Sequence, residues 1–90
     1  MKYIAISTNT KDVSPFLVEE GKRIAELQAL GIITDVWVKA DFSGAFVMLE
    51  CADEDAATAA LNTLPIVIND ATTFVLTEIT DGDSVRPGTA

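Results

Sequence analysis

The sequence predicts one small α+β domain in which two β-α-β units share a single antiparallel sheet. Three observations predict this class. Patterns typical of strands and helices alternate in the order strand, helix, strand, strand, helix, strand. The two middle strands are separated by only a few turn residues, which is typical of an antiparallel hairpin. A chain of 90 residues also provides enough apolar material for one core and too little for two.

The first β-α-β unit is expected over residues 3–39. Residues 3–8 alternate as a strand, and Ser14 followed by Pro15 predicts a helix start, because Ser can cap a helix and Pro suits its first position. The middle turn of the helix carries Glu20 and Gly21, and we expect the small Gly21 to let the helix approach the sheet closely. Gly31 is expected to end the helix before a strand over residues 32–39. The helix has an apolar stripe of helical period, formed by Phe16, Leu17, Ile24 and Leu27.

The second unit is expected over residues 45–79. A strand over residues 45–51 leads to Asp53, a residue type that caps helices. The following helix is expected to end at Pro65, because a residue that precedes proline disfavours helical backbone angles. Residues 66–71 form a connection, and residues 72–79 form the fourth strand. The whole pattern is that of the ferredoxin-like βαββαβ fold, a four-stranded antiparallel sheet with two helices on one face. Residues 1–80 are expected to form this domain and residues 81–90 a flexible tail.

The alternation within the strands predicts which side chains face the helices and which lie on the bare face of the sheet. We expect one set of mostly aliphatic residues under the helices: Ile4, Ile6, Val36, Val38, Val47, Leu49, Thr73 and Val75. We expect the bare face to carry Tyr3, Ser7, Asp35, Trp37, Lys39, Phe46, Met48, Glu50, Phe74, Leu76 and Glu78. Every strand then contributes an aromatic residue to the bare face. Two such faces packed together would bury them and could enclose a cavity, which predicts a homodimer.

Composition excludes several partners and chemistries. The chain has 14 acidic against six basic residues, for a net charge of −8, so nucleic acid and anionic membranes are poor partners. Because histidine is absent, a Ser-His-Asp triad and histidine metal ligands are impossible. The single Cys51 cannot form an intrachain disulfide. No metal or cofactor motif is found, and with neither a signal peptide nor a long apolar run the expected location is the cytoplasm.

The chain resembles the muconolactone isomerase-like proteins of the dimeric α+β barrel group. Three stretches carry the resemblance: Leu27–Gly31 followed by Trp37, then residues 47–50, which end in Glu50, and the Leu64-Pro65 step in residues 61–66. The resemblance implies a cofactor-free protein with a pocket for a small organic molecule, where enzymes of this type move a proton next to a lactone carbonyl. Those enzymes carry a histidine shortly before the strand tryptophan, and the matching neighbourhood of this chain reads Thr34-Asp35-Val36.

The candidate site follows from the bare face. Glu50 is the first candidate for a general base, because a carboxylate at the edge of an apolar wall is desolvated. Asp35 is the second candidate, and Tyr3 or Lys39 could donate a hydrogen bond to a developing oxyanion. We expect the ligand to contact Trp37, Lys39, Phe46, Met48 and Phe74.

Three functions remain open at this point. The protein could be an enzyme that moves a proton on a small lactone or enolisable acid. It could be a binding module that holds a small apolar ligand, or an accessory subunit, in either case without turnover. It could also be a structural homodimer, in which case the aromatic residues of the bare face form only an interface.

Overall fold

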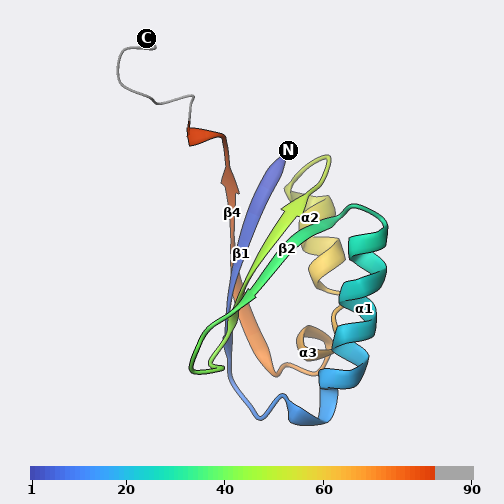
Figure 1. Ribbon diagram of the computed structural model, residues 1–90, viewed down its shortest axis with the longest axis vertical. Coiled ribbons are helices and arrows are strands. Elements are labelled where there is room, and N and C mark those ends of the chain that lie inside the picture. The colour runs from blue at the N-terminus through green and yellow to red at the C-terminus, as the bar shows by residue number, and fades with distance from the viewer. Residues whose placement is uncertain (83–90) are drawn as a thin grey trace.

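The computed structural model describes residues 1–82, and these form one sheet with helices on one of its faces (Figure 1). The elements run in the predicted order, with one additional short helix before the last strand. In chain order they are β1 (Lys2–Asn9), the 3-10 turn η1 (Ser14–Phe16), α1 (Leu17–Ala29), β2 (Ile33–Val38), β3 (Ala45–Glu50), α2 (Glu54–Leu61), α3 (Pro65–Ile68) and β4 (Thr72–Ile79).

The sheet has the strand order β2-β3-β1-β4, and every neighbouring pair is antiparallel. This order confirms the ferredoxin-like α+β fold. The central strand β1 pairs with β3 on one side and with β4 on the other, so Tyr3 lies opposite Leu49 and Glu78. A register shift between Ile33 and Asp35 in β2 places Ile33 and Val36 on the same face of the sheet, although they are three residues apart.

The ends of α1 are fixed by two local motifs, of which the sequence predicted one. At the C-terminus, Gly31 adopts φ 76° and donates its N–H to the Gln28 carbonyl, while Ile32 donates to the Leu27 carbonyl. These two bonds satisfy carbonyls that the helix end would leave free, and the positive φ explains the glycine. At the N-terminus the prediction that Ser14 caps the helix is wrong. Asp12 Oδ1 instead accepts from the Ser14 N–H and hydroxyl, at 3.0 and 2.7 Å.

The second half of the chain differs from the prediction at Pro65. Asp53 caps α2 as expected, with its Oδ1 accepting from the Ala56 N–H at 2.8 Å. However, α2 ends at Leu61, and Pro65 begins the short helix α3 instead of only following a helix end. Proline suits a first helical position because its φ is already helical and its missing N–H would have no partner there.

The predicted faces are correct for β2 and β3 and wrong for β1 and β4. In β1, Tyr3 and Ala5 are each 2% exposed beneath the helices, whereas Ile6 is 38% exposed on the other face. In β4, Val75 is 67% exposed, and Phe74 packs against the core. Apolar character alone favoured Ile over Ala and Ser at the helix-facing positions. Pairing with β3 instead fixes the register, because Tyr3 and Ala5 lie opposite the buried Leu49 and Val47.

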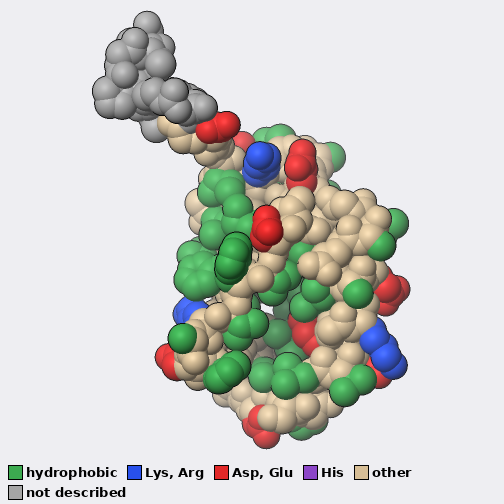
Figure 2. Space-filling view, viewed as in Figure 1, with side chains coloured by type: hydrophobic (Ala, Val, Ile, Leu, Met, Phe, Trp, Pro, Cys, Tyr) green, Lys and Arg blue, Asp and Glu red, His purple; other side chains and the backbone are tan. Residues whose placement is uncertain are grey.

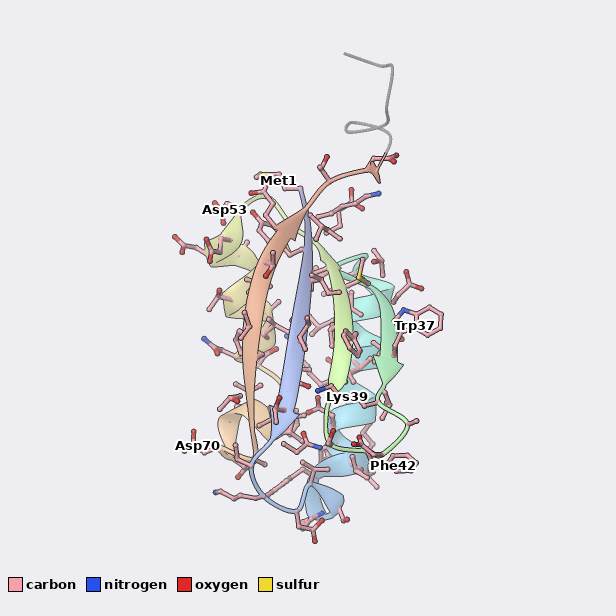
Figure 3. All side chains as sticks on the ribbon, turned by 90° about the vertical axis from the view of Figure 1, so that its left-hand side faces the viewer. Met1, Trp37, Lys39, Phe42, Asp53 and Asp70 are labelled. Carbon is pink, nitrogen blue, oxygen red and sulfur yellow. The ribbon has the colours of Figure 1, made fainter. Side chains whose placement is uncertain are left out.

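The bare face therefore carries a different set of side chains from the one predicted. Only two aromatic residues, Trp37 and Phe46, lie on it, and they pair with each other across β2 and β3. Lys39 extends over the Phe46 ring, with its Nζ 5.9 Å from the ring centroid. The remaining apolar members are aliphatic or thioether side chains: Ile4, Ile6, Met48, Val75 and Ile79. Figure 3 looks onto this face and shows Trp37 projecting from the edge strand β2.

The predicted tail begins at residue 81, and all but residues 81 and 82 lie outside the described part of the chain. None of the helices within residues 1–82 combines the length and the apolar character that are needed to cross a bilayer.

The β2–β3 hairpin packs directly against β1, and this contact predicts a large effect at Gly44. A Cβ at Gly44 would overlap the Ser7 carbonyl oxygen and lie 3.2 Å from the Thr8 Cα. Since these are backbone atoms, they cannot move aside cheaply. We expect Gly44→Ala to lower the free energy of unfolding by about 1–3 kcal/mol or more in urea denaturation.

The matched control is Gly21→Ala in α1. No atom lies within 4 Å of a Cβ placed at Gly21, and Ala has the higher helix propensity. This variant should be about 1 kcal/mol more stable than the wild type. Equal stabilities of Gly44→Ala and the wild type would mean that the hairpin does not lie against β1.

Candidate functional site

The principal cavity lies between the helices and the sheet, at the end of β1 that leads into α1. Its volume is about 530 Å³, within the range of about 300–1,000 Å³ that is typical of small-molecule sites. Figure 2 shows its opening between the sheet and α1, bordered by hydrophobic side chains in green. The aliphatic lining comes from both layers of the fold and includes Ile24, Val36, Val47, Leu61, Leu64, Ile66 and Val67.

The cavity exists because small residues face one another across the two layers. On β1 the helix-facing side chains over this region are Ala5 and Ser7, and on α1 the facing position is Gly21. We expected Gly21 to permit close packing of helix on sheet. That expectation is wrong, because no atom lies within 4 Å of a Cβ placed there. The space is the cavity itself.

Glu20 is the only buried carboxylate in residues 1–82, and it lines this cavity. It is 6% exposed, and it occupies the inward face of α1 two turns before the buried Leu27. Its Oε1 accepts a hydrogen bond of 3.1 Å from the Ile66 N–H at the start of α3. Burial removes water from the carboxyl group and raises its pKa above the ordinary value, and the bond from Ile66 only partly opposes this effect.

The second oxygen of Glu20, Oε2, differs from Oε1 in having no hydrogen-bond partner in the described part of the chain. Within residues 1–82, every fully buried side-chain nitrogen or oxygen has a hydrogen-bond partner. Oε2 has none among these residues, so it is not fully buried, and because Glu20 lines the cavity we infer that Oε2 is open to it. A carboxyl group held at one oxygen and open at the other can donate, accept or exchange a proton with a bound molecule.

The other polar side chains deep in the cavity are already satisfied by the backbone. The Ser7 hydroxyl accepts from the Ala45 N–H at 2.9 Å and donates to the Ala45 carbonyl at 3.3 Å. The Thr72 hydroxyl donates to the Thr8 carbonyl at 3.0 Å. These bonds tie the strands together and leave Glu20 as the group that is available to a ligand in the interior.

The exposed side chains that line the cavity are polar or aromatic and include Lys11, Asp12 and Phe42. Lys11 contributes an ammonium group that donates to the Asn69 carbonyl at 3.0 Å. Next to it, two hydrogen bonds from Ser14 lower the pKa of Asp12, whose carboxylate is thereby held in the ionised form. Phe42, at the tip of the β2–β3 hairpin, provides the aromatic part of the rim.

None of the three catalytic residues predicted from the sequence lines this cavity. Glu50 is exposed at the far end of the sheet, opposite Lys2, and lines a shallow depression there. Asp35 is exposed on the bare face, opposite Met48. Tyr3 is a core residue on the helix side, and burial is the main cause that raises its pKa. Their catalytic roles stay predictions, and the structure does not bring the three together in one chain.

The predicted ligand-binding residues are divided between the two faces. Trp37, Lys39, Phe46 and Met48 share the bare face as expected. Phe74 lies on the helix side and lines the cavity. The bare-face set would meet a ligand only where another molecule encloses that face.

Sequence reasoning missed Glu20, although the signal was present. The apolar stripe of the first helix was seen to be interrupted by Glu20 and Gly21. Glu20 lies seven residues before Leu27, so both face the same side of a helix. A carboxylate on the apolar side of an amphipathic helix is a candidate for a functional group, because burying it without a role is costly.

No cluster of three or more His, Cys, Asp or Glu side chains within residues 1–82 could hold a metal ion. Cys51 is half-buried, and desolvation raises the pKa of its thiol, which disfavours the nucleophilic thiolate.

No protein-family model and no curated protein matches the sequence. Among solved structures, the chain is similar to 5-chloro-2-hydroxyhydroquinone dehydrochlorinase from Burkholderia phenoliruptrix in complex with 2,5-dihydroxybenzoquinone. The TM-score is 0.80 at 11% sequence identity, over 93% of this chain and 98% of that one. The similarity shows a shared fold.

The burial of Glu20 predicts a pH-dependent stability. Because the pKa of its carboxyl is raised in the folded state, the folded protein binds more protons than the unfolded chain at pH values between the two pKa values. The stability that Glu20 contributes as a buried neutral acid is fully present below the ordinary glutamate pKa of 4.5. This stability is lost as the pH rises through the pKa of Glu20 in the folded state.

Glu20→Gln keeps an oxygen that can accept from Ile66 but cannot ionise. We therefore expect the stability of the wild type, relative to Glu20→Gln, to fall as the pH rises from about 4 to about 8. Urea denaturation at several pH values measures this difference. A difference that rises with pH or stays constant would contradict the burial of Glu20.

Proposed function

We propose that this protein is a cofactor-independent small-molecule-binding protein whose cavity holds a small lactone or another enolisable carbonyl compound, and that Glu20 moves a proton on it. The observation that carries the proposal is the carboxyl group of Glu20, buried in an apolar cavity with one oxygen bonded to Ile66 and the other open to the interior. The proposed activity is of the muconolactone isomerase-like type.

The chemistry requires one group that accepts and returns a proton. The ionised Glu20 would remove a proton from the carbon next to the ligand carbonyl, leaving an enolate. The resulting carboxylic acid would return that proton to another carbon of the conjugated system, so atoms and charge balance over the cycle. A carboxyl whose pKa is raised by desolvation is a stronger base when ionised, and its pKa lies closer to neutral pH, where such catalysis is most efficient.

Two further features support this proposal. The remaining N–H groups of the Lys11 ammonium, at the rim, are donors that could reach an enolate oxygen near the opening. The neighbouring dehydrochlorinase of the same fold was solved with 2,5-dihydroxybenzoquinone, a small oxygenated ring compound. A ring of that size is compatible with a cavity of about 530 Å³.

The second candidate is binding without turnover. The hydroxyl groups of Ser7 and Thr72 are hydrogen-bonded to the backbone, so Glu20 is the single functional group that is available to a ligand in the interior, and this favours the second candidate. A binding protein needs only that group to orient a ligand, whereas an enzyme must also stabilise the enolate.

The test of catalysis is proton exchange on candidate ligands. Unsaturated lactones and enolisable acids are incubated with the protein in D2O, and loss of the proton next to the carbonyl is followed by NMR. We expect Glu20→Gln to lower the exchange rate by about 10²–10⁴-fold, because it removes the base.

The matched control is Glu50→Gln, which makes the same chemical change at an exposed residue outside the cavity and should exchange at the wild-type rate. Loss of exchange in Glu50→Gln, with full exchange in Glu20→Gln, would move the site to the bare face. Binding of these compounds without exchange in the wild type would favour the second candidate.

We also propose that two copies of the chain associate through the bare face of the sheet. This face is apolar and uncovered in the single chain: Trp37 is 64% exposed and Val75 67% exposed. Ile6 and the half-buried Phe46 and Met48 continue the same surface. Contiguous apolar surface of this kind is rare on monomers and common at subunit interfaces.

Light scattering at micromolar concentration should report about twice the chain mass of 9.6 kDa. Val75→Glu places a charge within the proposed interface and should shift the mass toward that of one chain. Val18→Glu makes the same change at a residue of α1 that is 72% exposed, and should leave the mass unchanged. A wild-type protein that is monomeric at this concentration would contradict the interface.

A further inference from the structure

We infer that Phe42 is a ligand-contacting residue that covers the mouth of the cavity and favours ligands with a flat, conjugated ring. The inference rests on the proposed binding of a carbonyl compound in this cavity, and it adds a residue and a preference that the proposed function does not contain. Phe42 belongs to the cavity lining and is 76% exposed, so its ring has little protein around it on its outer side.

The backbone of Phe42 is held in a conformation that phenylalanine rarely adopts. Its φ is 60°, in the left-handed region, where a side chain with a Cβ is strained. The hairpin begins with a turn in which the Phe42 N–H donates to the Lys39 carbonyl at 2.8 Å. Phe42, the left-handed residue, is the last residue of that turn. Glycine or asparagine is the usual residue at such a position, because neither is penalised there as strongly.

The surrounding hydrogen bonds show how the strain is maintained. Asn9 binds the hairpin from β1 twice, through its side-chain amide to the Phe42 carbonyl at 3.1 Å and through its backbone N–H to the Ser43 carbonyl at 2.7 Å. Asp41 Oδ1 accepts from the Ser43 N–H at 3.0 Å and from its hydroxyl at 2.6 Å. The hairpin tip is thereby fixed against the strand that lines the cavity, and the phenyl ring is kept at the rim.

Because the side chain of Phe42 is exposed, its packing contributes little stability that could offset the strain of its backbone. Strained residues of this kind concentrate where a ligand is held. An aromatic ring at the rim offers a flat apolar surface, and it prefers another π system over a saturated ring of equal size by stacking or edge contact. The proposed base, Glu20, lies in the interior, so a methyl ketone that carries a ring would place its methyl carbon inward and its ring beneath Phe42.

The chain provides a matched control for the backbone. Asp70 is the other non-glycine residue in residues 1–82 with a left-handed φ, at 54°. It does not line the cavity, and Figure 3 shows it at the opposite edge of the sheet from Phe42. Replacing either residue with glycine relieves a left-handed side chain, but only Phe42→Gly also removes a surface from the rim.

The test compares two ketones that share a methyl ketone group and the same number of carbon atoms: acetophenone, with a flat ring, and cyclohexyl methyl ketone, with a puckered one. Binding is followed by NMR titration of the amide signals of residues 20–24. We expect the wild type and Asp70→Gly to bind acetophenone more tightly, by about two- to tenfold. Phe42→Gly and Phe42→Leu should each bind the two ketones with about equal affinity. Phe42→Leu keeps an apolar side chain at this position, so it provides the comparison if Phe42→Gly does not fold.

The outcomes separate this inference from the proposed function. If both ketones bind the wild type and the preference survives in Phe42→Leu and Phe42→Gly, the inference is wrong and the proposed cavity stands. If neither ketone shifts the signals of residues 20–24 in the wild type, both are wrong. If Phe42→Leu lowers the mass in light scattering and leaves the ketone preference intact, Phe42 belongs to a subunit interface and the inference is overturned.

Discussion

The decrease in side-chain size along the helix-facing side of the central strand β1 determines where the core is packed and where the cavity lies. Beneath the helices the strand presents Tyr3, then Ala5, then Ser7. Tyr3 fills the space near α2 and packs with Leu49 and Leu61 into the core. Ala5 and Ser7 reach much less far, so the second half of the same face leaves the layers apart. Core and cavity are therefore two ends of one helix–sheet interface.

The buried polar side chains that line the cavity form hydrogen bonds with the backbone, and these bonds stabilise this end of the helix–sheet interface. Ser7 and Thr72 bind backbone carbonyls and amides of neighbouring strands, and Glu20 connects α1 to the first turn of α3. The bond to Ile66 is a local compromise. It satisfies one carboxyl oxygen and a helix N–H that would otherwise have no partner, but it leaves the carboxyl group in an environment that disfavours its charge. Such a compromise is typical of positions that are retained for function rather than for stability.

The two faces of the sheet can serve different purposes because the pleat separates them completely. Ile4 and Ile6 point away from the cavity, and Ala5 and Ser7 point into it, although they alternate along four consecutive residues of one strand. The bare face is suited to contact with another apolar surface, and the helix face is suited to holding a small molecule. The β2–β3 hairpin connects the two faces, since Gly44 lets it lie against β1 and Phe42 carries an aromatic ring to the rim.

The order of the elements, the antiparallel hairpin, the cap at Asp53 and the glycine end of α1 could all be predicted from the sequence. These features depend on periodicity and on residues near one another in the chain, so local patterns specify them. Tertiary structure alone decided which side of β1 and β4 faces the helices, because Ile4 and Ile6 are more apolar than Ala5 and Ser7, yet strand register places them outside. Since the cavity is the space between Ala5, Ser7 and Gly21, and its carboxyl group meets Ile66 from 46 residues further along the chain, the site could be found only after the layers were assembled.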